Sequence, residues 1–286
     1  MTEQAAWVAL SLVRGVGGVT MQALLARFGT AQEALTASET DLRTVRGIGQ
    51  KTAAAIQSIN LTATAQNIAR WQSAGIYALP SHVPAYPPRL HTINDRPPTL
   101  FVQGQLPTPE IPSIAVVGTR SPSPAAQQQA ARAGERLARA GAAIISGMAL
   151  GVDGLAMKAA LSVSGSRTVG VLGSGVLVPY PQQHAALAHL LRMYGALVCE
   201  VAPDATVSTP GLVARNRLIS GMADAVLIIE TAADGGAMHA ARAAYKQGRA
   251  LWAVENAASG NRKLLASGHA RPVHANLSNL LDLLPG

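Results

Sequence analysis

The sequence predicts an α/β protein whose main domain is a doubly wound, mostly parallel sheet, preceded by a small all-α domain. From residue 111 onward, short apolar runs of strand length alternate with helical stretches, which is typical of parallel strands joined by crossover helices. Residues 1–72 instead read as helical throughout. The expected domains are therefore a helical domain over 1–72, a Pro-rich docked connector over 73–110, and an extended Rossmann-like domain over 111–286.

The predicted sheet is organised around residues 114–149, where an apolar run, a Gly-containing turn, a helical segment and a second apolar run follow one another. This order forms a strand-helix-strand unit of a parallel sheet. The expected strands are 114–117, 142–145, 168–172, 196–199, 225–229 and 250–254. The expected helices between them are 125–140, 153–162, 183–194, 213–222 and 236–247.

The helical region contains an internal repeat. Two Val-Arg-Gly-x-Gly segments start 32 positions apart, at Val13 and Val45, and helical runs 20–28 and 51–59 follow them. This resembles a pair of helix-hairpin-helix units, whose Gly-x-Gly backbone and following helix N-terminus can approach a phosphate. The glycines fit equally well as sharp turns in a small bundle.

The connector is rich in proline between positions 80 and 98. Prolines at this density break helices and favour extended chain, and residues 99–102 can form a short strand that leads into the next domain. We therefore expect a segment that docks on the main domain.

Composition favours a globular, cytoplasmic protein. The chain has 286 residues, of which 49% are hydrophobic and 13% charged. No apolar run approaches 18 residues, and no signal peptide opens the sequence. The single Cys199 excludes an internal disulfide and is expected to be an inert core residue. No metal-ligand, Walker A or nucleophile-elbow pattern occurs, so we expect no metal, no cofactor and no catalytic residue.

The net charge of +8 is concentrated in the predicted sheet domain. Residues 1–110 hold eight Lys and Arg against six Asp and Glu, whereas residues 111–286 hold fifteen against nine. Such an excess favours a polyanionic partner, nucleic acid first, although a basic surface can also serve solubility alone. Only ten aromatic residues occur in the whole chain, so extended base stacking is not expected to dominate binding.

Several polar residues and glycines follow the predicted strands. Gly118 and Arg120 follow the first, and Ser146 and Gly147 follow the second. The carboxyl ends of parallel strands meet at one edge, where helix N-termini offer free N–H groups to anions. The dinucleotide fingerprint is incomplete, because only Gly118 of its three glycines is present. The pattern predicts a phosphate-handling site that is not a nicotinamide site.

A second basic cluster lies between the fourth and fifth strands of this domain. Arg215, Asn216 and Arg217 stand at a helix start, and Gly235 opens the next helix. Paired arginines offer forked donors to phosphate oxygens or base edges. The alternative is that these arginines are surface caps paired with nearby acids.

Three acids near the same edge provide a hydrolytic alternative. Asp153, Glu200 and Glu230 could form a carboxylate set beside a phosphate cradle. The structural interpretation is that Asp153 caps the helix after Gly151 and that the glutamates are hydrogen-bond partners at strand ends.

Six segments, taken in order, match a known family over nearly the whole chain. They are Tyr-Pro-Pro-Arg-Leu at 86–90 with the lead-in from Arg-Pro-Pro at 96–98 to Gly104, Val-Gly-Thr-Arg at 117–120, Ser-Gly-Met-Ala-Leu-Gly-Val-Asp at 146–153, Val-Leu-Gly-Ser-Gly at 171–175 with Tyr-Pro at 180–181, Ala-Arg-Asn-Arg-Leu-Ile-Ser-Gly at 214–221 and Ser-Gly-Asn at 259–261. Each is weak alone, but their order and spacing resemble those of the DNA-processing protein A (DprA, also called Smf) family.

The resemblance implies a helical SAM-like domain followed by an extended Rossmann domain that forms a homodimer and binds single-stranded DNA. It implies that RecA recombinase is a partner, loaded onto incoming single strands during natural transformation (competence) and helped past single-strand-binding protein. The dimer contacts are expected at 251–254 and the C-terminal helix. The expected DNA-binding residues are Gly118, Arg120, Ser146, Gly147, Lys158, Arg215, Asn216, Arg217 and Gly235.

The sequence departs from the family pattern at three places near this site, one of which is the turn at 234–239, where Asp-Gly-Gly-Ala-Met-His replaces a usual Ser-Gly-Ser. Met157, followed by Lys158, stands where the family commonly has a histidine, and Leu212 stands where an aromatic is usual. Phosphate contacts are therefore expected to contribute more to affinity than base stacking.

Two other function classes remain. A nucleotide phosphoribohydrolase of the lysine-decarboxylase-like Rossmann group would share the sheet, but the segment from Asp234 lacks the Thr and the acid of that group's Pro-Gly-Gly-x-Gly-Thr motif. An adaptor that binds only proteins would fit the weakly charged helical domain.

Overall fold

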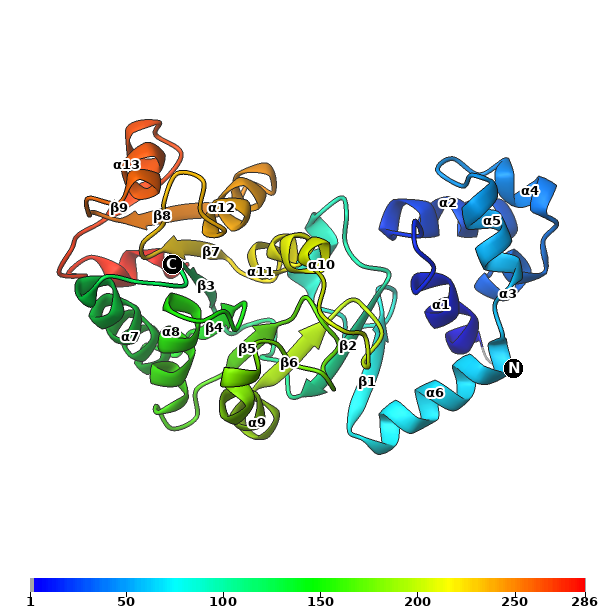
Figure 1. Ribbon diagram of the computed structural model, residues 1–286, viewed down its shortest axis with the longest axis horizontal. Helices are drawn as coiled ribbons and strands as arrows, with labels where there is room; N and C mark the ends of the chain where they lie inside the picture. Colours follow the sequence, from blue (N-terminus) through cyan, green and yellow to red (C-terminus); the bar gives the residue numbers. More distant parts are fainter. Residues whose placement is uncertain (1–2, 286) are drawn as a thin grey trace.

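The computed structural model describes residues 3–285, which form a helical N-terminal domain followed by a nine-stranded sheet with helices on both faces (Figure 1). In sheet order the strands are β1 Ile76–Pro80, β2 Thr99–Gly104, β6 Ala196–Cys199, β5 Thr168–Val171, β4 Ala143–Ser146, β3 Ser113–Val117, β7 Ala225–Ile228, β8 Ala250–Val254 and β9 Arg271–Val273.

The N-terminal helices are α1 Glu3–Ser11, α2 Gly18–Phe28, α3 Ala31–Thr36, α4 Glu39–Arg43, α5 Gln50–Gln57 and α6 Leu61–Ser73. The helices of the sheet domain are α7 Pro124–Arg139, α8 Val152–Leu161, α9 Ala185–Tyr194, α10 Thr209–Ala214, α11 Asn216–Gly221, α12 Ala237–Lys246 and α13 Ser259–Ala266. Short 3-10 helices are η1 Pro88–Thr92, η2 Gln182–His184 and η3 Leu280–Leu283.

The sheet is doubly wound, as predicted. From β3 the chain first adds β4, β5 and β6 on one side by parallel pairing, then returns to add β7, β8 and β9 on the other side. Two pairings at one end of the sheet, β1 with β2 and β2 with β6, are antiparallel. The winding reverses between β3 and β7, and open α/β sheets form their ligand crevice at the carboxyl side of this point.

The six predicted strands are confirmed to within one residue at each end.

The single helix expected over 213–222 is wrong, because α10 begins at Thr209 and Arg215 separates it from α11. Pro210 occupies the first turn of α10, where its missing N–H costs nothing. The sequence analysis missed β1, β9 and α13. Proline stands within β9 and ends β1, and strand periodicity is weak in such short segments.

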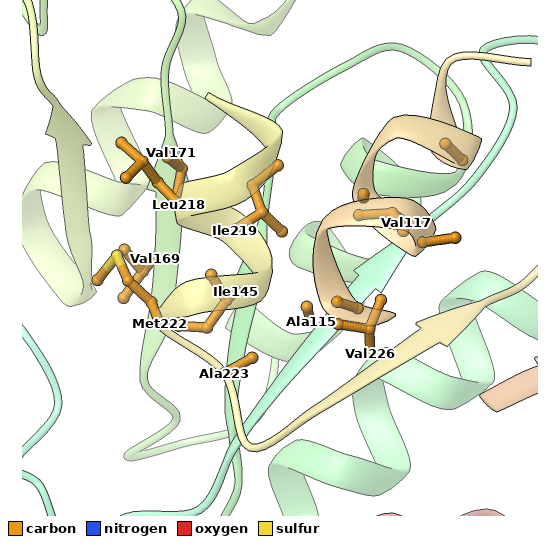
Figure 2. Packing of buried hydrophobic residues seen from close by; sticks show 14 of the residues in the cluster. Ala115, Val117, Ile145, Val169, Val171, Leu218, Ile219, Met222, Ala223 and Val226 are labelled. Carbon is orange, nitrogen blue, oxygen red and sulfur yellow. The ribbon is translucent and has the colours of Figure 1, made fainter. Parts of the chain in front are cut away.

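Both faces of the sheet are covered by apolar helix faces. α7 and α8 pack on one face through small residues, so closely that a side chain at Gly134 would collide with the Ala156 backbone. α11 and α12 cover the other face together with the connector. Figure 2 shows Leu218 of α11 and Met222, the residue that follows this helix, against side chains of β4 and β5. This packing fixes α11, which begins immediately after Arg215.

The two Gly-x-Gly hairpins of the N-terminal domain pack reciprocally. Gly15 and Gly47 both have a positive φ, 97° and 92°, which favours glycine. A Cβ on Gly15 would lie 3.2 Å from the Thr52 hydroxyl, and one on Gly47 would lie 3.3 Å from the Thr20 hydroxyl. The sequence repeat therefore appears in space as two hairpins, each against the helix that follows the other.

The N-terminal domain shares a core with the sheet domain. Side chains of α1 and α6, including Val8 and Trp71, belong to the same buried cluster as Phe101 of β2. The Trp7 indole N–H donates to the Pro98 carbonyl at 2.9 Å. Segment 73–110 thus connects the two domains through strands and buried contacts.

The expected dimer contact at 251–254 is wrong. These residues lie in β8, which is paired on both sides by β7 and β9, and all four side chains are buried within the protomer. An interior strand has no free edge or surface for a second copy.

Across residues 3–285, none of the helices combines the length and apolar character needed to span a bilayer.

Candidate nucleic-acid interface

A groove of about 570 Å³ lies at the carboxyl ends of β3 and β7, where the winding of the sheet reverses. Its walls come from the turns after β3 and β4, from α10 and α11, and from the loop between β7 and α12. The backbone ties the two strand ends together, since the Thr119 N–H donates to the Glu230 carbonyl at 2.7 Å. The groove therefore has a rigid floor.

Arg120 lies on the rim of this groove and is exposed. Its guanidinium makes no hydrogen bond or ion pair with any residue that the structure describes. The turn that carries it is fixed by close packing, because a Cβ at Gly118 would lie 2.6 Å from a Val152 methyl group. Arg120 is thus a free cation on a fixed backbone, able to pair with an anion in the groove.

Arg215 lines the same groove but is only 6% exposed. Its Nη1 donates to the Gly147 carbonyl and, at 2.6 Å, to the Val171 carbonyl. Burial lowers the pKa of Arg215, while the nearby Asp153 carboxylate raises it. Arg215 therefore holds the ends of β4 and β5 together and places a positive charge beneath the groove.

Arg217 turns away from the groove. Its Nη2 lies 2.6 Å from a Glu200 carboxylate oxygen, and its Nε lies 3.1 Å from an Asp95 carboxylate oxygen. The interpretation of these arginines as partners of nearby acids therefore holds for Arg217. Arg215 instead binds backbone carbonyls. The structure brings Arg120 and Arg215 together and separates Arg217 from them.

The turn after β4 is built by Ser146 and Asp153. The buried Ser146 hydroxyl donates to the Val116 carbonyl at 2.6 Å. The Asp153 carboxylate accepts from the Gly147 N–H at 3.1 Å and from the Ala149 N–H at 3.4 Å. Burial raises the pKa of Asp153, and Arg215 and these N–H groups oppose the shift.

The expectation that Asp153 caps α8 is wrong. The N-cap residue of α8 is Gly151, and no side chain caps this helix. Asp153 lies in the first helical turn. Its carboxylate orders the preceding loop through the Gly147 and Ala149 N–H groups, and Gly151, with a φ of 78°, reverses the chain before the helix.

The other predicted residues lie at different depths. Asn216 and Gly235 line the groove, and the Asn216 amide donates to the carbonyls of Leu212 and Val213. Lys158 is exposed in the last turn of α8 and does not line the groove.

The family model for DNA recombination-mediator protein A matches residues 78–285. The chain belongs to this family. A second model, for the helix-hairpin-helix motif, matches residues 6–69. It agrees with the two reciprocal hairpins of the N-terminal domain.

Curated relatives in the family include two proteins named Smf. Protein Smf of Escherichia coli is 40% identical over 179 residues, which cover 62% of this chain and 48% of that protein. Protein Smf of Synechocystis sp. is 33% identical over 261 residues, which cover 89% of this chain and 65% of that protein. The chain therefore spans roughly half to two thirds of the length of these relatives.

Two solved structures from the family share the fold. DNA processing protein A from Streptococcus pneumoniae has a TM-score of 0.82 at 22% identity and covers all of this chain and 99% of that chain. DNA processing protein A from Helicobacter pylori has a TM-score of 0.65 at 27% identity and covers 73% of this chain and 97% of that chain. A unique single-stranded DNA binding mode is described for that protein.

The groove has further lining residues that were not predicted as site residues, among them Tyr180, Thr209 and His239. Tyr180 is 39% exposed and adds an aromatic side chain to the groove lining. Its place in a Tyr-Pro pair shortly after the third predicted strand was a usable signal. Thr209 and His239 come from α10 and α12, and only the packing of these helices brings them together.

Each of the three candidate hydrolytic carboxylates has its own protein partners. Glu230 accepts from the backbone N–H and the hydroxyl of Ser123, at 3.0 and 2.6 Å, at the start of α7. Glu200 pairs with Arg217, and Asp153 orders the β4 turn. In the described part of the chain, no cluster of three or more His, Cys, Asp or Glu side chains is arranged to hold a metal ion.

Proposed function

We propose that the groove at the β3–β7 reversal binds single-stranded DNA and that the protein is a recombination mediator without catalytic chemistry of its own. The observation that carries the proposal is Arg120, an exposed and unpartnered guanidinium with the buried charge of Arg215 beneath it. The charge of Arg120, which no described acid neutralises, attracts a polyanion, and a guanidinium suits phosphate oxygens. The buried charge of Arg215 is offset in part by Asp153 beside it. The single-stranded DNA binding described for the Helicobacter pylori relative supports the proposal.

In this proposal the predicted residues have different tasks. Gly118 and Gly235 line the groove with backbone, Gly147 leaves room for the Arg215 guanidinium, and Arg120 and Asn216 contact the strand. Ser146 and Arg215 hold the turns in place, and Lys158 and Arg217 act outside the groove.

The proposed partners are those of a family mediator. They are RecA recombinase, which the protein would load onto incoming single strands in natural transformation, single-strand-binding protein, which RecA must displace, and a second copy of this chain. Membership in a family described as recombination mediators supports this role, and the proposed location is the cytoplasm.

Arg120→Ala tests the site. Because Arg120 would contact phosphate rather than bases, the variant should weaken binding to all single-strand sequences alike. The magnitude of the slope of log K against log salt concentration should fall by about 0.7. Fluorescence anisotropy with labelled oligo-dT over a salt series measures both quantities.

The matched control is Arg132→Ala, which removes an equally exposed arginine from α7, away from the groove. If both variants bind oligo-dT like the unsubstituted protein, the groove is not the binding site.

The hydrolase alternative has its own test. Incubation with nucleoside monophosphates should release no free base, because Glu230 is already bound to Ser123 at the start of α7. Base release that disappears in Glu230→Gln would replace the mediator proposal with an enzymatic one.

A further inference from the structure

A second hollow of about 430 Å³ adjoins the groove on the side of α12. The two share Val213, Asn216 and His239 as lining residues. Its other walls come from the connector after η1, from Arg217, and from the outer face of α12. The groove therefore continues past Asn216.

The α12 wall of this hollow carries a stripe of basic side chains. His239, Arg242 and Lys246 are spaced three and four residues apart, which places them on one helix face. All three are exposed, and none forms a hydrogen bond or ion pair with a residue between 3 and 285. The opposite face of α12 is buried through Ala240 and Ala244, so the stripe is held on a packed helix.

The ion-pair cluster at the other wall of the hollow carries a net charge of −1, from one arginine and two acids. Arg217 is paired with Glu200 and Asp95, and the Asp95 side chain on the far wall is 64% exposed. Arg242 and Lys246 are left as uncompensated cations. Since they lie beside the groove, they extend its positive potential in one direction only.

We propose that a single strand held in the groove leaves it over Asn216 and runs along α12, with its backbone phosphates paired to Arg242 and Lys246. The ligand is the sugar-phosphate chain, because the charges of Arg242 and Lys246 attract phosphates irrespective of base sequence. From His239 to Lys246 the helix rises about 10 Å, so only strands longer than the groove reach the far end of the stripe. This inference rests on the proposed function of the groove and assigns it an exit path.

The test is the dependence of affinity on strand length. Oligo-dT from about 4 to about 16 nucleotides is titrated against the unsubstituted protein, Arg120→Ala and Arg242→Gln/Lys246→Gln. The double variant should bind the shortest strands normally and lose most of the affinity gained on lengthening, on the order of 20-fold at 0.1 M salt for two phosphate contacts. Arg120→Ala should weaken binding at every length.

The matched control is Arg132→Gln/Lys263→Gln, which removes the same charge from exposed sites on α7 and α13 that line neither hollow. Thermal melting establishes that the variants are folded. If the double variant gains affinity with length as the control does, while Arg120→Ala still weakens binding, the exit path is refuted and the groove site stands. Equal loss at every length also refutes it, and an Arg120→Ala protein that binds normally refutes the groove site itself.

Discussion

At the residue scale, three arginines that were all predicted to bind DNA have three different surroundings. Arg120 is exposed and unpartnered, Arg215 is buried against two carbonyls, and Arg217 pairs with two carboxylates. A guanidinium that is already bound in the protein has fewer donors for phosphate. Affinity should therefore depend most directly on Arg120, whereas Arg215 should matter for both stability and binding.

Gly147→Ala should be strongly destabilising. A Cβ there would overlap the Arg215 guanidinium, which cannot move because both carbonyl partners are fixed backbone. Overpacking of this kind costs about 1–3 kcal/mol. Chemical denaturation should show the loss, and oligo-dT affinity should fall with it.

Gly236→Ala provides the comparison. Gly236 lines the groove, its φ of −57° and ψ of −33° are helical, and no atom lies within 4 Å of an added Cβ. It should leave stability nearly unchanged. Equal stability of the two variants would contradict the assigned packing of Arg215 on Gly147.

At the element scale, the site is a product of helix placement. α11 is packed on β4 and β5 by Leu218 and by Met222 at its C-cap (Figure 2), and α12 is packed by its alanines. The strand ends supply glycines and backbone, and these two helices supply Asn216 and the cations of the second hollow. Charge changes on the solvent face of such helices should alter binding without altering the fold.

Asp95→Asn should strengthen binding to long strands. Removal of the one exposed carboxylate in the second hollow frees Arg217 from one of its two acid partners and lessens repulsion of phosphate. The gain should be about fivefold at 0.1 M salt for one added phosphate contact, and should be absent for the shortest strands. Asp282→Asn, an exposed acid in η3, serves as the control. A gain equal to that of the control would contradict the proposed path.

At the scale of the whole molecule, the helical domain and the sheet domain share one buried cluster. Phe101 of β2 packs edge-on against Trp71 of α6, with ring centroids 5.3 Å apart. Arg70 and Asp204 add an ion pair at 2.6 Å across the same boundary, although it is exposed and contributes little. Thermal unfolding should therefore be one cooperative transition.

Trp7→Phe tests this coupling. It removes one of two hydrogen bonds to the Pro98 carbonyl, which also accepts from the Ser81 N–H at 2.8 Å, at a cost of about 0.5–1.5 kcal/mol. Trp71→Phe is the matched variant, because the Trp71 N–H is buried and makes no hydrogen bond with the described residues. Calorimetry should show a larger loss for Trp7→Phe and a single peak for both. Two separate peaks in the unsubstituted protein would show that the domains unfold independently.

The strands of the sheet could be predicted because apolar runs bounded by turns depend on local sequence. The position of the groove followed from the same pattern, since strand carboxyl ends share one edge. The partners of each arginine could not be predicted. Glu200 and Asp95 are distant from Arg217 in sequence, and the burial of Arg215 depends on the glycine at position 147 of another turn.

The sequence by itself determined the winding of the sheet, the repeated hairpins and the edge at which cations collect, because periodicity and turn residues act over a few positions. The tertiary structure alone decided which cation is free. Whether a guanidinium faces water, a carbonyl or a carboxylate depends on contacts between segments far apart in the chain. That choice made Arg120 the open donor and, by packing α12 beside α11, joined a second basic hollow to the groove.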